Sequence, residues 1–142
     1  MSTVDTVAFL GGERVFGRPL VSESDLAEEI VRGFPFAALD MVVRTLVSDL
    51  ISQTSIYEIV SAVRMHHVQN QLSREESGRL ARLARVAVRA VEALGSTEKG
   101  LRWLAIPNRA LDGRRPLELL AAEEGSKLVE DVLGRIEHGV IT

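Results

Sequence analysis

One long amphipathic helix, with a start signal and a stop signal of its own, constrains the fold more than any other feature of this sequence. Ser73-Arg-Glu-Glu76 forms a capping box: the Ser73 hydroxyl can accept from the N–H of Glu76, and the Glu76 carboxylate can accept from the N–H of Ser73. The pattern predicts a helix over residues 74–94 that stops at Gly95. Its apolar positions recur at helical spacing and form one stripe, made of Leu80, Leu83, Ala84, Ala87, Val88, Val91 and Leu94.

Shorter helices are predicted on both sides of this one. The N-cap residues at 22–25 open a helix that closes at Gly33, and Pro35 opens a second helical stripe that continues to residue 50. Two short helical patterns follow within residues 53–70, joined by a turn near Ser61. In the second half, helices are expected over 97–105 and 116–121, and a last amphipathic helix after Gly125 that ends at Gly139.

Residues 1–21 differ from this helical pattern. Their glycines, proline and β-branched residues favour an extended arm or a small hairpin. The charge balance then changes near residues 70–73, because residues 1–72 sum to −4 and residues 73–142 to +1. We therefore predict an all-α chain with an arm over 1–21, a helical domain over 22–72 and a second helical domain over 73–142.

Composition excludes several classes of protein. No apolar run approaches the roughly 18 residues that span a bilayer, and the N-terminus lacks the basic region of a secretory signal. The chain has no cysteine, so a disulfide scaffold, a thiol nucleophile and a cysteine-based zinc site are excluded. A cytoplasmic protein without membrane contact is the expectation.

The search for catalytic or metal-binding groups finds no constellation of that kind. His66 and His67 are adjacent, so on a helix they point about 100° apart and cannot chelate one ion. The serines are explained as helix caps, and the acid pairs are consecutive residues of first turns or solvated faces. We therefore predict a protein that is not an enzyme and needs no cofactor, and a small enzyme of unknown type stays as the least favoured alternative.

The two short helices within 53–70 are a candidate for DNA binding, since two helices joined by a tight turn resemble a helix-turn-helix. The second helix would present side chains that read bases, namely Arg64, His66, His67, Gln69 and Asn70. A net charge of −3 limits attraction to phosphates, so DNA binding by the chain alone is expected to be weak. An arginine row on the long helix is the alternative phosphate surface, or else a solvated face or a protein interface: Arg79, Arg82, Arg85 and Arg89.

Trp103, the sole tryptophan, is expected to anchor the loop over 106–115 against the long helix; a hot spot that faces a partner is the alternative. The end of the chain is a second candidate for partner binding. Gly139 lets the backbone leave the last helix, and little chain remains after it to cover Val140 and Ile141. Their burial is then best supplied by a partner.

Several sequence blocks together resemble a known family. The second half carries Leu72-Ser-x-Glu-Glu-Ser77 and Trp103-Leu-x-x-Pro-Asn-x-Ala-Leu-x-Gly113-x-x-Pro-Leu117, and the first half carries Leu10-Gly-Gly12 and Gly33-Phe-Pro35. With these blocks the chain resembles the Xre/MbcA/ParS antitoxins, which are paired with RES-domain toxins. The resemblance covers nearly the whole chain, and the tryptophan block is its most specific part.

The resemblance implies a non-enzymatic antitoxin that blocks the active-site cleft of an NAD-degrading RES toxin. It also implies a homodimer with a degenerate Xre-like helix-turn-helix domain that binds operator DNA and represses its own operon. The residues that it assigns to toxin binding are Arg135, Ile136, Glu137, His138, Gly139, Val140, Ile141 and Thr142. The alternative is a stand-alone helix-turn-helix transcriptional regulator without a toxin partner.

Overall fold

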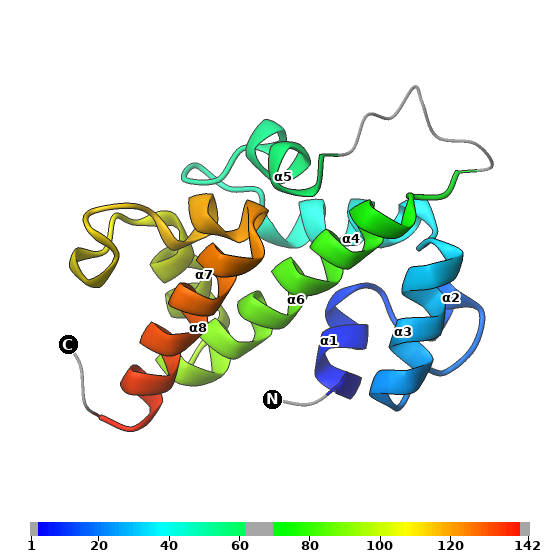
Figure 1. The fold of residues 1–142 in the computed structure, drawn as a ribbon, viewed down its shortest axis with the longest axis horizontal. Helices are drawn as coiled ribbons and strands as arrows, with labels where there is room; N and C mark the ends of the chain where they lie inside the picture. Colours follow the sequence, from blue (N-terminus) through cyan, green and yellow to red (C-terminus); the bar gives the residue numbers. More distant parts are fainter. Residues whose placement is uncertain (1–2, 62–69, 140–142) are drawn as a thin grey trace.

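The computed structural model describes residues 3–61 and 70–139, and within them every regular element is helical (Figure 1). The all-α prediction is therefore confirmed. In the described part of the chain, no helix is both long and apolar enough to cross a membrane. The elements are α1 Thr3–Phe9, α2 Glu13–Phe16, α3 Glu23–Arg32, α4 Phe36–Leu46, α5 Gln53–Val60, α6 Arg74–Leu94, α7 Thr97–Ala105, η2 Arg109–Leu111, η3 Pro116–Ala121 and α8 Glu123–Glu137.

The predicted long helix, α6, is the centre of the fold. Both bonds of its capping box form, with Ser73 Oγ accepting from the Glu76 N–H at 3.1 Å and Glu76 Oε1 accepting from the Ser73 N–H at 2.8 Å. Gly95 closes the helix in the left-handed conformation, as predicted. Figure 1 shows α1 and α3 beside one part of α6 and α7 and α8 beside the other, and contacts join α6 to all four.

The two parts of the chain that the charge balance separates share one hydrophobic core around α6. Residues before position 73 and after it belong to the same cluster of buried apolar side chains. The cluster includes fully buried Leu10, Leu26, Leu39 and Ile56 from the first part, Leu80 and Leu83 from α6, and Leu104, Leu120 and Leu133 from the last part. The division at residues 72 and 73 stays a prediction.

The sequence blocks around Gly33 and Leu72 pack against each other. The Leu72 N–H donates to the Phe34 carbonyl at 2.8 Å, and Ser77 Oγ accepts from the Phe34 N–H at 2.7 Å. Gly33 has φ 97°, and a Cβ at this position would lie 2.4 Å from the Leu72 carbonyl oxygen. Only glycine therefore fits here. The contact joins two blocks that lie about 40 residues apart in the sequence.

The expectation of an extended arm or hairpin over residues 1–21 is wrong. Residues 3–9 and 13–16 form the helices α1 and α2, and the glycines between and after them have positive φ. Val7 is 5% exposed and Leu10 is fully buried, and α1 packs against α3 and α6. Burial against the rest of the protein decides the conformation of this segment and overrides its weak helical propensity.

Two further helix boundaries differ from the prediction. The stripe predicted to reach residue 50 ends at Leu46, because the Ser48 hydroxyl accepts from the Leu50 N–H at 3.1 Å and favours a turn. The last helix begins before Gly125, at Glu123, and ends two residues before Gly139. Gly125 therefore lies inside the first turn of α8 and does not precede the helix. A side chain would not fit at this position, because a Cβ would lie 2.1 Å from the Leu119 carbonyl oxygen.

Candidate functional site

The helix α8 is firmly attached to the body of the protein. Its residues Val129, Val132 and Leu133 are at most 1% exposed, and it packs against α6 and η3. Arg89 of α6 adds two ion pairs, to Glu130 at 3.4 Å and to Glu137 at 3.2 Å. The far end of α8 is thus held in a fixed position relative to α6.

The predicted toxin-binding residues at this end differ in their exposure and in their contacts with the rest of the protein. Ile136 packs partly against the core, and Glu137 is paired with Arg89. Arg135, His138 and Gly139 are exposed; the His138 ring lies 2.7 Å from the Gly134 carbonyl oxygen, and Gly139 has φ 70°. Three further predicted residues lie outside the described residues: Val140, Ile141 and Thr142.

The loop between α7 and η3 is closed by hydrogen bonds around Asn108. The Asn108 side chain accepts from the Ala110 N–H at 2.8 Å, and the Asn108 carbonyl accepts from the Gly113 N–H at 2.9 Å. The Asn108 N–H donates to the Arg114 carbonyl at 3.0 Å, which completes the closure. Leu111, only 6% exposed, anchors the loop in the core. The loop is therefore a built element with a defined position.

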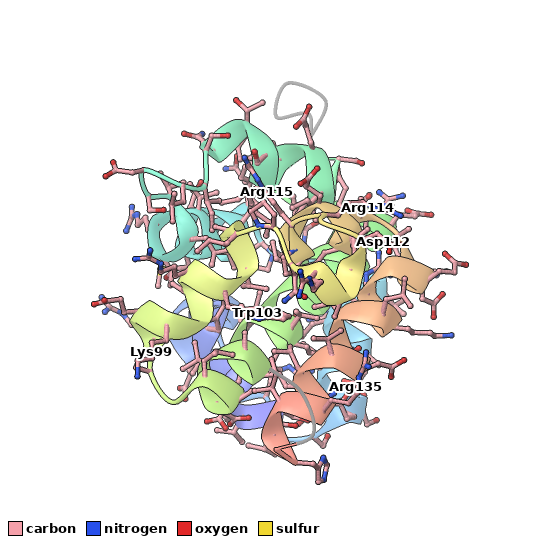
Figure 2. All side chains as sticks on the ribbon, turned by 90° about the vertical axis from the view of Figure 1, so that its left-hand side faces the viewer. Lys99, Trp103, Asp112, Arg114, Arg115 and Arg135 are labelled. Atoms are coloured by element: carbon pink, nitrogen blue, oxygen red, sulfur yellow. The ribbon has the colours of Figure 1, made fainter. Side chains whose placement is uncertain are left out.

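Trp103 lies beside this loop and serves partly as the anchor predicted for it. The side chain is half-buried and packs against the main core. Figure 2 shows Trp103 in the middle of a face built from α7, the loop that follows it and α8. The ring therefore stabilises the fold and keeps an exposed part on this face.

Charged side chains surround Trp103 on the same face, which we call the basic face (Figure 2). It consists of four cations, Lys99, Arg114, Arg115 and Arg135, of the anion Asp112, and of Glu118, which lies beside Arg115. All six are exposed. Within the described residues the only ion pair of these cations joins Arg115 to Glu118 of the next turn, at 3.9 Å and with both side chains more than half exposed.

The arginines of the row on α6, unlike the cations of the basic face, are engaged with other parts of the protein. Each of its four members is half-buried and reaches a group on another element. Arg79 and Arg82 donate to the backbone carbonyls of residues 60 and 121, at 3.5 and 3.4 Å. Arg85 pairs with Glu23 at 2.6 Å, and Arg89 with the two acids of α8. The row is therefore neither a solvated face nor a free phosphate-binding surface.

The helix α5 covers the first of the two short helices predicted within residues 53–70. α5 ends at Val60, and the residue that caps it, Ser61, has φ 62°, which agrees with the turn predicted near this residue. Asn70 is exposed with φ 57°, and its carbonyl accepts from the Phe36 N–H at 2.7 Å. The remaining base-reading candidates lie outside the described residues: Arg64, His66, His67 and Gln69. The recognition helix stays a prediction.

No catalytic or metal site emerges from the described part of the chain. It contains no group of three or more potential metal ligands among His, Cys, Asp and Glu. A cleft of about 200 Å³ between α5, α7 and η3 is lined mainly by apolar side chains, and its lining includes neither histidine nor cysteine. The shifted pKa values belong to a structural cluster: a hydrogen bond to Glu29 raises the pKa of Arg18, and the Val21 N–H lowers the pKa of Asp25.

Comparison with known proteins extends this description. Residues 89–139 match the family model described as the antitoxin Xre/MbcA/ParS C-terminal toxin-binding domain. An Antitoxin Xre of Yersinia enterocolitica is 31% identical over 133 residues, which cover 91% of this chain and 89% of the relative. An Antitoxin Xre of Photorhabdus laumondii is 30% identical with the same coverage, and one of Pseudomonas putida is 26% identical over 84% of this chain and 76% of the relative.

The chain belongs to the Xre antitoxin family. The resemblance noted in the sequence is therefore confirmed. The toxin-binding match of this antitoxin begins at Arg89, near the end of α6, and includes α7, the closed loop, η3 and α8. It thus contains the described part of the predicted toxin-binding end and the whole basic face. Sequence reasoning did not identify the basic face as a site; the signal that could have found it is the excess of cations over residues 99–115.

Proposed function

We propose that this antitoxin neutralises a RES-domain, NAD-degrading toxin by occluding its active site with the end of α8 and the residues that follow. The observation that carries the proposal is that the toxin-binding match extends to residue 139, where α8 is held on α6 by buried Val129 and Leu133 and by Arg89. A fixed base of this kind lowers the entropy that the projecting segment loses on binding. In this role the antitoxin works by binding alone and is not an enzyme.

The test is a truncation that removes residues 139–142 and keeps Glu137 and His138, so that the ion pair to Arg89 and the helix end survive. Co-expression with the RES-domain protein of the same operon should no longer protect growth, while the thermal melt of the truncated chain stays unchanged. Glu130→Gln is the matched control, since it breaks the other ion pair between α8 and Arg89 and leaves every proposed toxin-binding residue in place; it should still protect growth. Full protection by a folded truncation would contradict active-site occlusion by this segment.

Operator binding is a second candidate function, favoured by the left-handed turn that ends α5 at Ser61. We infer that a homodimer uses residues 53–70 to bind its operator and represses its own operon. Arg64→Ala and Gln69→Ala should each weaken binding to a duplex from the promoter region and leave toxin neutralisation intact. Unchanged affinity in both variants would move the DNA surface elsewhere. Operator binding without any toxin partner would favour the stand-alone regulator.

A further inference from the structure

We propose that the basic face docks on an acidic surface of the toxin that adjoins the active site occluded by the end of α8, with Arg135 belonging to both contact regions. This inference rests on the proposed function, because it takes the toxin as the partner. It adds a second contact region and states its chemistry: carboxylate side chains of the toxin around an aromatic centre supplied by the antitoxin.

The charge of the basic face is opposite in sign to that of the protein. The face, with Glu118 included, carries a net charge of +2, whereas the whole chain carries −3, so the remainder sums to −5. A local field of this sign attracts an acidic surface and orients it during diffusional encounter. The rest of the molecule repels the same surface, which favours one docking orientation over the others.

The cations of the basic face are free to make such contacts. Lys99, Arg114 and Arg135 form no ion pair within the described residues, and the pair between Arg115 and Glu118 is long and solvated. Breaking an exposed pair of this kind costs little. The arginine row of α6, by contrast, would have to give up carbonyl and carboxylate partners before it could bind anything else.

The closed loop holds the arginines of the face in place before any partner arrives. Asn108 makes bonds at both ends of the loop, and the Arg114 N–H donates to the Leu111 carbonyl at 3.2 Å. Asp112 and Gly113 take φ 58° and 78° at the tip, which fixes the direction of the chain. Groups held in this way lose less freedom on binding, and the gain in affinity is correspondingly larger.

A protein partner fits the basic face better than a nucleic acid does. Trp103 lies at its centre, and tryptophan and arginine are the residues most enriched in the hot spots of protein interfaces. Asp112 lies among the cations and would repel phosphates. Every residue of the face also falls within the toxin-binding match.

The test is charge reversal at the two loop arginines in the full-length antitoxin. Arg114→Glu/Arg115→Glu should slow association with the purified RES-domain protein of the same operon by about tenfold or more at low salt. The difference from the wild type should shrink as salt rises. Asp112→Asn raises the net charge of the face and should speed association, since asparagine tolerates the left-handed conformation at that position.

The matched control is Arg14→Glu/Arg74→Glu, which makes the same change in net charge at two exposed cations away from the face. Equal slowing by the control would show an effect of total charge and overturn the proposal. Unchanged association of the loop variant would overturn it too, and would leave occlusion by the end of α8 standing. A wild type that does not bind the RES-domain protein at all would overturn the proposed function itself. A loop variant that loses binding only to promoter DNA would assign the face to nucleic acid instead.

Discussion

The arginine row of α6 and the basic face contain similar numbers of cations, yet the structure uses them differently. In the row, every guanidinium reaches a group on another element: the carbonyls that end α5 and η3, an acid of α3 and two acids of α8. On the basic face, the sole ion pair within the described residues joins neighbours one turn apart. The row fastens helices together, whereas the cations of the face keep the freedom that the proposed docking on a partner requires.

The difference shows what a cluster of positive charge means in a sequence. The spacing of the row along α6 looks like a stripe for binding, and it is the more regular of the two patterns. What separates the two clusters is whether carbonyls and carboxylates from other elements lie within reach. Only the tertiary structure supplies that information.

Trp103 both packs on the core and lies at the centre of the basic face, so its loss should have the largest effect. Trp103→Ala removes a half-buried ring that packs on the core, and we expect it to lower the free energy of unfolding by about 3 kcal/mol. Toxin binding should weaken as well. Urea unfolding measures the first effect and titration with the toxin the second. A variant that keeps wild-type stability but does not bind would show that the ring contributes to toxin binding alone and not to the stability of the fold.

Gly100→Ala tests the attachment of the basic face to α6. Gly100 lies where α7 crosses α6 so closely that a Cβ would be 2.6 Å from the Val91 backbone. Backbone atoms on both sides cannot yield easily, so we expect a loss of about 2 kcal/mol even though alanine favours helix. Gly78→Ala is the control in α6, because nothing lies within 4 Å of a Cβ there, and it should stabilise slightly. Equal stability of both variants would contradict the close crossing.

Local chemistry alone predicts a large part of this fold. The capping box of Ser73 and Glu76, the stop at Gly95 and the turn at Ser61 each depend on groups within a few residues, and all three predictions are confirmed. The helix α1 was missed because the burial of Leu10 depends on distant parts of the chain.

The candidate sites differ in the same way: one is visible in a short stretch of sequence, and the other only in the folded structure. The proposed toxin-binding end was inferred from the sequence through family resemblance, whereas the basic face joins residues from α7, the closed loop and α8 that only folding brings together. The roles of the α6 arginines also depended on partners as far as 62 residues away along the chain.

The capping box of α6 offers a further test of the shared core, with a smaller expected loss of stability. Ser73→Ala leaves the Glu76 N–H without its acceptor, so we expect a loss of about 1 kcal/mol in urea unfolding. Ser22→Ala is the matched control, because Ser22 and Asp25 form the same box at the start of α3. Since α6 contacts both parts of the chain and α3 fewer elements, the Ser73 variant should lose more. A change below about 0.3 kcal/mol would contradict the role of this cap.

The smallest expected effect separates the two clusters of cations most directly. Arg89→Gln breaks two partly exposed ion pairs, to Glu130 and Glu137, and should cost about 0.5–1 kcal/mol, less at high salt. Arg114→Gln removes one charge that has no ion-pair partner within the described residues, and should change stability by less than about 0.5 kcal/mol. Paired urea unfolding at low and high salt measures both variants, and toxin association at low salt should slow for Arg114→Gln. If Arg114→Gln destabilises as much as Arg89→Gln, the basic face is fastened to the fold like the row, and the contrast between the two clusters fails.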